Sequence, residues 1–517
     1  MRNAVRTAGL LTGPLLFLLT LVLPEASGLS AAGQRTGGVA LWMAVWWITE
    51  AVPLYVTGLL PLALFPLLHI VNGKGLASQY GHNLLFLFLG GFMLARAVER
   101  WNLHERIALR IVHAVGVSPR RLVLGMMVAT AFLSLWISNT AATLIMLPIG
   151  TAILLEAAMA AGTRVEEHPE LTKMATVMML GITYAASVGG MGTLVGTVPN
   201  IVFAAQMSQL FPDAPDISFV AWMKVALPFV VVFVPLMWWL LTRWLFPLHL
   251  HELPGGREVI DARLRALPPL AGPERRVAVV FLLTALAWVF RADLDLDVVR
   301  IPGWASLLGL DGWVDDTTVA VVAALALFAL PAGKHLPAGI APTSTGALLD
   351  WDTARTIPWG LLILFGGGLA LSKGVETSGL SVWIGDSLRV FSGLPLAVML
   401  VVMCYLVTFL TEVMSNTALT TLLMPVLGAL AVSLGYNPLL FMFAATLCAS
   451  CAFMLPVATP PNAIVFGSGL VTAPQMARAG IWLNLLAPPL ILAVVYLLAL
   501  PVLGIEPGGV PEWAHGR

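Results

Sequence analysis

Two polar triplets, Ser138-Asn139-Thr140 and Ser415-Asn416-Thr417, interrupt apolar segments of the chain. Each lies within a stretch, 122–161 or 394–434, that we expect to form a helical hairpin with the triplet at its tip. The second arm of such a hairpin presents free backbone N–H groups and the positive end of its dipole, which suit a carboxylate or sulfate oxygen. The first arm presents free carbonyls, and these join the Ser hydroxyl and Asn amide oxygens as ligands for a small cation.

The alternative is that Ser, Asn and Thr only form hydrogen bonds between packed helices. Their recurrence in two hairpins favours a binding site, because non-helical backbone at membrane depth is tolerated only where protein buries it or where it lines a wet cavity. No Lys or Arg lies near either tip. An anion would then need the charge of bound cations, and this dependence is a physical basis for symport.

A broken helix is expected after each hairpin. In the first, Gly189–Gly192 precedes Thr197–Asn200, and in the second, Pro456 precedes Thr459–Asn462. Gly and Pro release backbone carbonyls from helical hydrogen bonds. These breaks therefore predict further ligands, with a simple structural kink as the alternative.

The hairpins and broken helices belong to an internal repeat. When Leu84 is aligned with Leu361 and no gap is allowed, Leu84–Glu99 matches Leu361–Glu376 with nine of sixteen positions identical, and the same register relates the two triplets. The loop charges described below orient the two halves oppositely, so we interpret them as inverted repeats. Such repeats are typical of secondary transporters, whose substrate binds near the membrane midplane. Chance similarity between apolar helices is the alternative, and the polar triplets that match in the same register argue against it.

Composition places these segments in a membrane. Hydrophobic residues make up 59% of the 517 residues and charged residues only 10%, whereas an average soluble domain carries about 25% charged residues. The apolar residues come in long blocks, and ~20 of them span a bilayer as a helix. This pattern excludes a soluble globular protein and an outer-membrane barrel, whose strands would alternate in short segments. No basic stripe indicates a nucleic-acid partner.

We expect an all-α polytopic membrane protein with about eleven transmembrane helices and two re-entrant hairpins. The first apolar block, Ala8–Ser27, follows Arg2 and Arg6 as a signal peptide would, but its length and the later blocks favour an uncleaved membrane helix. The other predicted crossings are Leu41–Val71 (two helices), Leu84–Glu99, Met174–Gln209 with a break, Val220–Leu248, Val277–Phe290, Thr317–Leu330, Gly360–Val375, Pro438–Phe466 with a break and Ile481–Leu503.

The repeat and the apolar blocks together predict the domain organisation. The chain is expected to contain N-terminal scaffold helices (1–71), a first inverted repeat (72–249) with its hairpin (122–161) and broken helix (174–209), a cytoplasmic basic loop (250–276), connecting helices (277–348), a second inverted repeat (349–503) with its hairpin (394–434) and broken helix (438–471), and a C-terminal tail (504–517).

Loop charge predicts the orientation, because Lys and Arg concentrate on the cytoplasmic side. Arginines cluster in 100–121 and 249–276, whereas Asp213–Asp216 and the three aspartates of 293–297 mark acidic loops. With a cytoplasmic N-terminus and an outside C-terminus, these assignments agree only if the first hairpin enters and leaves on the cytoplasmic side and the second on the outside. We therefore predict a multi-pass protein of the inner (plasma) membrane with two re-entrant hairpins.

Glu50 and Glu412 are the most isolated carboxylates within the apolar segments. Intramembrane ionisable residues are functional candidates by default, so either could mark proton coupling. The alternative for Glu412, which follows Thr411, is a hydrogen-bonded structural acid.

Four sequences carry a resemblance to a known family: WWITEAVPL (Trp46–Leu54), WDTARTIPWGLLILFGGG (Trp351–Gly368), TPPNAIVFGSG (Thr459–Gly469) and the paired S-N-T triplets. Together they resemble the divalent anion/sodium symporter family, which includes sodium-coupled dicarboxylate and citrate transporters. The resemblance implies a homodimer in the bilayer, with a scaffold and a transport domain in each protomer, that moves its substrate by an elevator mechanism. One departure is internal, since Val198 stands where the other half has Pro460.

The same resemblance implies which residues bind the ions and the substrate. One sodium ion would be held by Ser134, Ser138 and Asn139 with the Gly196 backbone. Another would be held by Asn416 with backbone at Thr411, Met414 and Ala458. The substrate carboxylates would contact Asn139, Thr140, Thr197, Asn416, Thr417 and Thr459.

The sequence therefore predicts a secondary active transporter that couples sodium to C4-dicarboxylates such as succinate, malate or fumarate, and no enzyme. A sodium-independent exchanger, a sulfate or citrate symporter and a channel are the alternatives within transport. An intramembrane hydrolase would need a nucleophile or a metal set, and neither H-E-x-x-H nor G-x-S-G occurs, because Gly467-Ser468-Gly469 lacks the leading glycine. An ATP-driven pump is disfavoured because no G-x-x-x-x-G-K-[ST] loop occurs.

Overall fold

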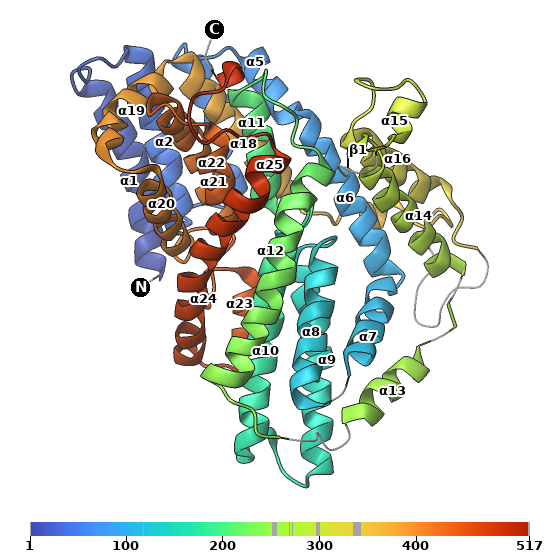
Figure 1. Cartoon of the computed structure of the whole chain (residues 1–517). Helices are drawn as coiled ribbons and strands as arrows, with labels where there is room; N and C mark the ends of the chain where they lie inside the picture. Colours follow the sequence, from blue (N-terminus) through green and yellow to red (C-terminus); the bar gives the residue numbers. More distant parts are fainter. Residues whose placement is uncertain are drawn as a thin grey trace.

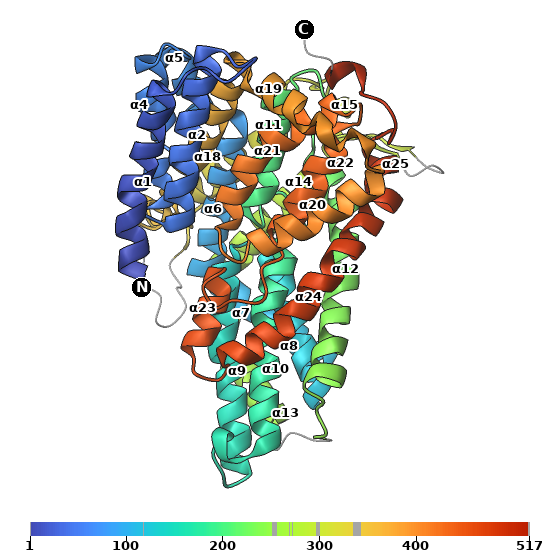
Figure 2. The same ribbon diagram turned by 90° about the vertical axis from the view of Figure 1, so that its left-hand side faces the viewer.

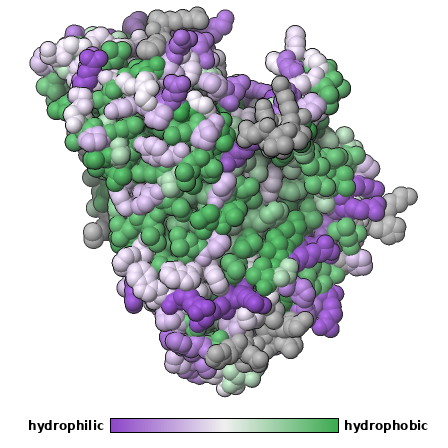
Figure 3. Space-filling model, in the orientation of Figure 1, coloured by the Kyte–Doolittle hydropathy of each residue, from purple (hydrophilic) through white to green (hydrophobic). Residues whose placement is uncertain are grey.

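The computed structural model describes residues 2–116, 118–250, 256–267, 269–270, 272–295, 300–333 and 343–514. Among these residues, seven helices are long and apolar enough to cross a membrane, and four shorter helices are also apolar. Leu15, Val231 and Leu283 are 61%, 62% and 59% exposed, and Figure 3 shows a broad hydrophobic band across the molecule. So large an apolar surface belongs in lipid. The described chain is a polytopic membrane protein, helical apart from one short ribbon.

The N-terminal region contains two long helices followed by short ones (Figure 1). The two helices predicted over Leu41–Val71 correspond to α2 (Ala31–Thr49) and to the apolar helix Leu54–Leu67. The predicted start is wrong, because α2 begins at Ala31, where Gln34 and Arg35 lower the apolar content. Glu50 ends that helix in a left-handed conformation with φ 47°, and prolines interrupt the rest. The elements are α1 (Arg2–Val22), α2 (Ala31–Thr49), α3 (Leu54–Thr57), α4 (Leu60–Leu67), α5 (Gly73–Ala77) and the 3-10 turn η1 (Ser78–Gly81).

The next region contains the first predicted hairpin and broken helix. The basic segment 100–121, expected as a loop, contains an amphipathic helix whose buried Arg106 pairs with Glu274 (Nη2 to Oε2, 2.9 Å). The elements are α6 (Asn83–Arg100), α7 (Leu103–Val115), α8 (Pro119–Ser134), α9 (Asn139–Ala160), η2 (Val165–Glu167), α10 (Pro169–Gly190), α11 (Val198–Leu210), α12 (Phe219–Trp239) and the π-helical η3 (Leu240–Leu245).

The connecting region is more helical than predicted. The basic loop 250–276 contains one helix and the start of the next, although its residues 251–255, 268 and 271 lie outside the described residues, as do Asp297, 334–342 of the connecting segment and 515–517 of the tail. The elements are α13 (Gly256–Ala266), α14 (Gly272–Val289), the antiparallel strands β1 (Leu294–Asp295) and β2 (Arg300–Ile301) with Leu294 opposite Ile301, α15 (Trp304–Leu307) and α16 (Asp316–Ala329).

The last region covers the segments in which the sequence predicts the second hairpin and broken helix. The elements are α17 (Trp351–Ala354), α18 (Trp359–Thr377), α19 (Leu380–Leu388), η4 (Arg389–Gly393), α20 (Leu396–Leu410), α21 (Asn416–Ser433), α22 (Pro438–Ala449), α23 (Pro460–Gly467), α24 (Ala473–Val494), the π-helical η5 (Val495–Ala499), α25 (Leu500–Val502) and η6 (Glu512–Ala514).

The same order of elements occurs twice. Both α6 to η3 and α18 to η5 contain, in this order, a long helix, a short helix, two hairpin arms, two halves of a broken helix and a long helix with a π-helical end. An ion pair recurs as well, since Arg96 lies 2.7 Å from Glu99 and Lys373, at the equivalent position of the second half, lies 3.1 Å from Glu376. In Figure 1, α8 and α9 lie in the lower half of the view and α20 and α21 in the upper half.

The first halves of the broken helices hold the hairpin arms. α10 packs against α8, α9, α12 and α23, and α22 packs against α20, α21 and α24. Every residue of α22 is buried, as expected for a helix that is apolar all round. The hairpin tips are therefore fixed against the points where α10 and α22 end.

Candidate functional site

Three oxygen atoms from different elements meet at the tip of the first hairpin. The Ser134 Oγ, at the end of α8, lies 2.8 Å from the Asn139 Oδ1 at the start of α9 and 2.7 Å from the Ala186 backbone oxygen on α10. A hydroxyl has one hydrogen to donate, so it satisfies one of these two acceptors at a time. Ser134 is fully buried. Converging buried oxygens that share one hydrogen form the kind of ligand set that hard cations take.

The tip of the second hairpin repeats this geometry. The Thr411 Oγ1, at the end of α20, lies 2.7 Å from the Asn416 Oδ1 and 2.7 Å from the Ala449 backbone oxygen on α22. In the register of the internal repeat, Thr411 and Asn416 occupy the positions of Ser134 and Asn139. Two oxygen clusters of one design therefore lie at the two hairpin tips.

Glycine is required where α10 ends beside the first cluster. A Cβ on Gly196 would clash with the backbone oxygens of Gly190 and Ser134, and a Cβ on Gly190 would clash with the Asn139 Oδ1. The two glycines thus bring backbone oxygens next to Ser134 and Asn139, in a place that a side chain would fill. The residues present fit a small cation at this position.

A buried asparagine ties together the backbone at each break. The Asn200 Nδ2 donates to the backbone oxygens of Gly190 (3.1 Å) and Thr193 (2.7 Å). The Asn462 Nδ2 donates to those of Ala452 (3.1 Å) and Leu455 (3.0 Å). Both asparagines are fully buried. They satisfy carbonyls that the broken helices leave without helical partners.

A buried hydrogen bond joins the two halves beside the second break. The Thr183 Oγ1 on α10 donates to the Asn462 Oδ1 on α23 over 2.8 Å. Because Thr183 and Asn462 are both fully buried, this bond couples the broken helix of the second half to α10 of the first.

Glu412, between α20 and α21, is buried and accepts four hydrogen bonds. Its Oε1 accepts from the backbone N–H groups of Phe453 (2.7 Å) and Met454 (2.9 Å) and from the Asn484 Nδ2 (2.7 Å), and its Oε2 accepts from the Leu455 N–H (3.0 Å). Four donors and no acceptor suit an ionised carboxylate. The other predicted acid, Glu50, is exposed at the end of α2.

Two further hydroxyls lie next to the clusters at equivalent positions. Ser187 and Ser450 directly follow Ala186 and Ala449, whose backbone oxygens belong to the clusters. Both side chains are buried, and neither hydroxyl has a hydrogen-bond partner within the described part of the chain. Buried polar groups are nearly always paired, so these two hydroxyls are candidates for contact with a bound ion.

The helix N-termini differ in how they are capped. Ser138 caps α9 by accepting from the Ala141 N–H (3.2 Å), and Thr459 caps α23 by accepting from the Asn462 N–H (3.3 Å). Ser415 and Thr197 give α21 and α11 no side-chain cap in the described structure. Among the described hydrogen bonds, the first-turn N–H groups of α21 have no partner and remain available to an anion. In α11, Pro199 has no N–H and the Asn200 N–H donates to the Thr197 backbone oxygen (3.3 Å), so only the N–H of Val198 remains in the first turn.

The structure brings together part of the predicted set. Ser134, Asn139 and Gly196 meet at the first tip, and Thr411 and Asn416 meet at the second. The backbone N–H groups of Met414 and Ala458 bond to Leu410 and Leu455, and among the described hydrogen bonds none joins these two residues to Asn416. Thr140 and Thr417 lie in the first turns of α9 and α21.

Sequence reasoning missed the roles of Asn200, Asn462, Ser187, Ser450 and Asn484. The two asparagines end the V-P-N and P-P-N sequences, and their recurrence in both halves was the signal that could have found them. The two serines lie within apolar helix ends, where a hydroxyl carries no pattern of its own. Asn484 contacts Glu412 from a distant segment, and nothing in the local sequence indicates this.

Comparisons with known proteins agree with this architecture. The model of the sodium:sulfate symporter transmembrane region matches residues 5–504. The chain is 43% identical to the sodium-dependent dicarboxylate transporter SdcS of Staphylococcus saprophyticus, over 98% of this chain and 93% of that protein, and equally similar to SdcS of Staphylococcus aureus.

A solved structure shares the fold at a greater distance. MtrF of Neisseria gonorrhoeae, described as one of a class of antimetabolite efflux pumps, aligns with a TM-score of 0.58 at 15% identity, over 98% of this chain and 97% of that chain. At this identity the likeness concerns the fold alone. The family match covers nearly the whole chain, and the chain belongs to the sodium:sulfate symporter family.

Proposed function

We propose that this chain is a secondary active transporter that carries C4-dicarboxylates, such as succinate, malate or fumarate, together with sodium ions. The observation that carries the proposal is the pair of buried oxygen clusters, Ser134–Asn139 and Thr411–Asn416, each at a hairpin tip beside a broken helix. Relatives at 43% identity bear the name sodium-dependent dicarboxylate transporter. A member of this transporter family is not an enzyme.

The proposed sodium sites lie at the two clusters. In the first, the oxygens of Ser134, Ser138 and Asn139 and the backbone at Gly196 surround one ion. In the second, the Asn416 side chain and the backbone at Thr411, Met414 and Ala458 surround another. A bound sodium ion would contact all of the converging oxygens, which otherwise share the single hydrogen of one hydroxyl. It would also bring positive charge to a region whose sequence has no Lys or Arg.

The proposed substrate site lies between the sodium sites. The residues that we assign to it start helices after the hairpin tips and breaks: Asn139 and Thr140, Thr197, Asn416 and Thr417, and Thr459. Helix N-termini stabilise carboxylates through free N–H groups and the helix dipole. Two of these helices, α11 and α21, lack a side-chain cap in the described chain and pack against each other. A dicarboxylate would bind only when sodium offsets its charge.

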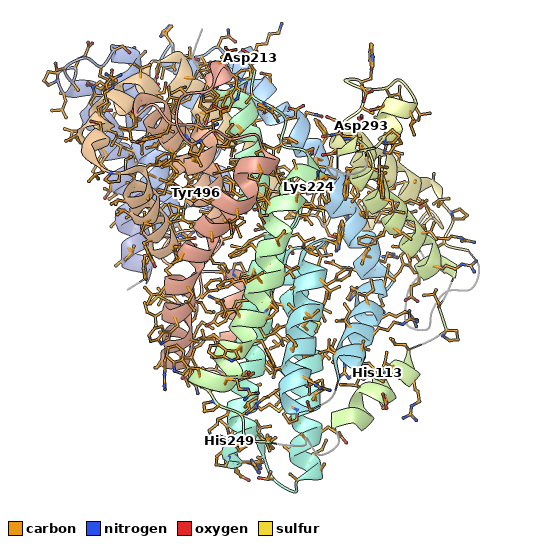
Figure 4. The ribbon with its side chains drawn as sticks, viewed as in Figure 1. His113, Asp213, Lys224, His249, Asp293 and Tyr496 are labelled. Carbon is orange, nitrogen blue, oxygen red and sulfur yellow. The ribbon has the colours of Figure 1, made fainter. Side chains whose placement is uncertain are left out.

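We infer that the two halves are inverted repeats with re-entrant hairpins. In Figure 4, the acidic residues Asp213 and Asp293 are labelled at the upper end of the molecule, and His113 and His249, next to the arginine-rich segments, at the lower end. This agrees with a cytoplasmic lower end. Figures 1 and 2 both place the start of α1 well below α25, which agrees with a cytoplasmic N-terminus and an outside C-terminus.

We also infer an elevator movement within a homodimer. The helices that carry the site, α8 to α12 and α20 to α24, pack mainly on one another. By contrast, α1 packs with α2, the helices α2 to α4 pack with α18, and α14 and α16 pack with α6. Such a division suits a transport domain that slides along a scaffold. The homodimer rests on the resemblance of the sequence to its family.

The experiment is uptake of labelled succinate into proteoliposomes that contain the purified protein, with an inward sodium gradient or with potassium in its place. We expect uptake only with sodium, and inhibition by unlabelled malate and fumarate but not by sulfate or citrate at equal concentration. Absence of succinate uptake, together with sodium-dependent uptake of labelled sulfate, would replace the dicarboxylate proposal with a sulfate symporter.

A further inference from the structure

The two oxygen clusters share their geometry but differ in charge. In the register of the internal repeat, the first hairpin has Leu135 at the position of Glu412. There the hairpin is tied to the broken helix by a neutral bond, from the Thr193 Oγ1 to the Leu135 backbone oxygen (2.5 Å). In the second half, Leu455 is equivalent to Thr193, because Leu455 precedes Asn462 by the same number of residues as Thr193 precedes Asn200. The carboxylate of Glu412 replaces that neutral bond.

Glu412 organises the unwound segment between α22 and α23 from one side. It accepts from three consecutive backbone N–H groups, those of Phe453, Met454 and Leu455. The Asn462 Nδ2 holds the carbonyls of the same segment from the other side. Successive N–H groups that converge in this way form a concave anion site, and here the anion is part of the protein.

The charge of Glu412 has no ion-pair partner among the side chains that the structure describes. Its side chain is buried, with a relative exposure of 4%, and among the described residues no Lys, Arg or His forms an ion pair with it. Hydrogen bonds reduce the cost of burying a charge but leave the charge itself uncompensated. Thr411, the neighbour of Glu412 in sequence, contributes its hydroxyl to the second cluster. A sodium ion at that cluster would supply a countercharge.

We propose that Glu412 is a positioning residue of the second sodium site, and that its charge makes this site bind sodium more tightly than the first. The inference rests on the proposed function. The carboxylate fixes the unwound segment beside Thr411 and Asn416 and attracts the ion by charge. The first site, with Leu135 in the same place, has no such charge. The second site therefore fills first as the sodium concentration rises.

The test measures binding of labelled sodium to the full-length detergent-purified protein by equilibrium dialysis, without any dicarboxylate. We expect two affinities in the wild type. Glu412→Gln, which keeps the shape but removes the charge, weakens the tighter affinity by roughly tenfold to a hundredfold, the range for charges about 12 to 6 Å apart at an effective dielectric constant of ~20. The weaker affinity stays unchanged.

Two variants separate the charge from the anchoring bonds. Asn484→Ala removes one of the four donors and leaves the charge, so the tighter affinity should change less than about threefold. Glu412→Asp keeps the charge on a shorter side chain, so it should lower the melting temperature yet keep the tighter affinity. If Glu412→Gln binds sodium as the wild type does, or if Asn484→Ala and Glu412→Asp lose as much affinity as Glu412→Gln, the proposal is overturned. Wild-type protein that binds no sodium would instead refute the proposed function.

Discussion

The Ser134 Oγ lies 2.8 Å from the Asn139 Oδ1 across the tip of the first hairpin. The equivalent pair in the second half, Thr411 and Asn416, lies 2.7 Å apart. In both pairs the hydroxyl also lies 2.7 Å from a backbone oxygen of the broken helix. The first half uses a serine hydroxyl and the second half a threonine hydroxyl, at the same place and with the same two kinds of partner. This indicates that each site requires the hydroxyl oxygen.

The first prediction concerns the two asparagines at the tips. Asn139→Ala and Asn416→Ala each remove one oxygen from a cluster, so we expect sodium-dependent succinate uptake to fall by about a hundredfold, the upper range for disturbing the surroundings of a bound metal. Asn437→Ala is the control. Asn437 caps α22 by accepting from the Leu439 N–H (3.0 Å), so its loss costs about 1 kcal/mol of stability but should leave the sodium dependence intact. Near-normal uptake by both tip variants would refute the cluster assignment.

The second prediction concerns the glycine at the first break. Gly196→Ala would place a Cβ against the backbone oxygens of Gly190 and Ser134, and the backbone cannot give way easily where buried helices are close-packed. We expect loss of sodium-dependent uptake and a lower melting temperature. Gly467→Ala, at the end of α23, adds a Cβ with nothing within 4 Å and should behave as the wild type. Uptake by Gly196→Ala equal to that of Gly467→Ala would contradict a closely packed cradle.

The third prediction distinguishes a ligand from an unpaired hydroxyl. Ser187→Ala and Ser450→Ala each remove a buried hydroxyl that lacks a partner among the described residues. Without sodium, the variants should be more stable than the wild type, by about 1 kcal/mol, because burying an unpaired polar group is costly. If the hydroxyls contact bound ions, the rise in melting temperature on adding sodium should shrink in both variants. An unchanged rise in both would remove them from the ion sites.

Some of this arrangement could be predicted from the sequence and some could not. The hairpin tips and the breaks could be located, because triplets of small polar residues and Gly- or Pro-rich turns stand out against apolar segments. The bonds of Glu412 to Asn484 and of Thr183 to Asn462 could not, because each joins residues far apart in the chain. The start of α2 was missed because Gln34 and Arg35 lower its apolar content.

The fourth prediction concerns a loop outside the apolar helices. Asp350 caps α17 and accepts from the N–H groups of Thr353 and Ser344, each over 2.9 Å. Burial raises the pKa of Asp350, but the hydrogen bonds from Thr353 and Ser344 outweigh it and hold that pKa below its usual range. A depressed folded-state pKa gives stability that is complete above the unfolded pKa of about 3.9 and is lost as the pH falls towards the folded value.

Asp350→Asn should therefore be less stable than the wild type by about 1 kcal/mol at pH 7, the usual contribution of a helix cap. Thermal unfolding in detergent at pH 7, 5 and 3.5 measures the difference. We expect the full difference in stability between wild type and variant at pH 7 and pH 5, and a smaller difference at pH 3.5. A difference that stays constant across these three values would mean that the charge of Asp350 does not contribute.

Coupled movement of sodium and dicarboxylate is the central claim, and accumulation of succinate against its own gradient tests it most directly. Proteoliposomes without internal dicarboxylate are given an inward sodium gradient, with the membrane potential clamped at zero, and the internal succinate concentration is measured over time. We predict that it rises above the external concentration and collapses when the sodium gradient is dissipated. Uptake that ignores sodium but requires preloaded dicarboxylate would contradict the claim and indicate an exchanger.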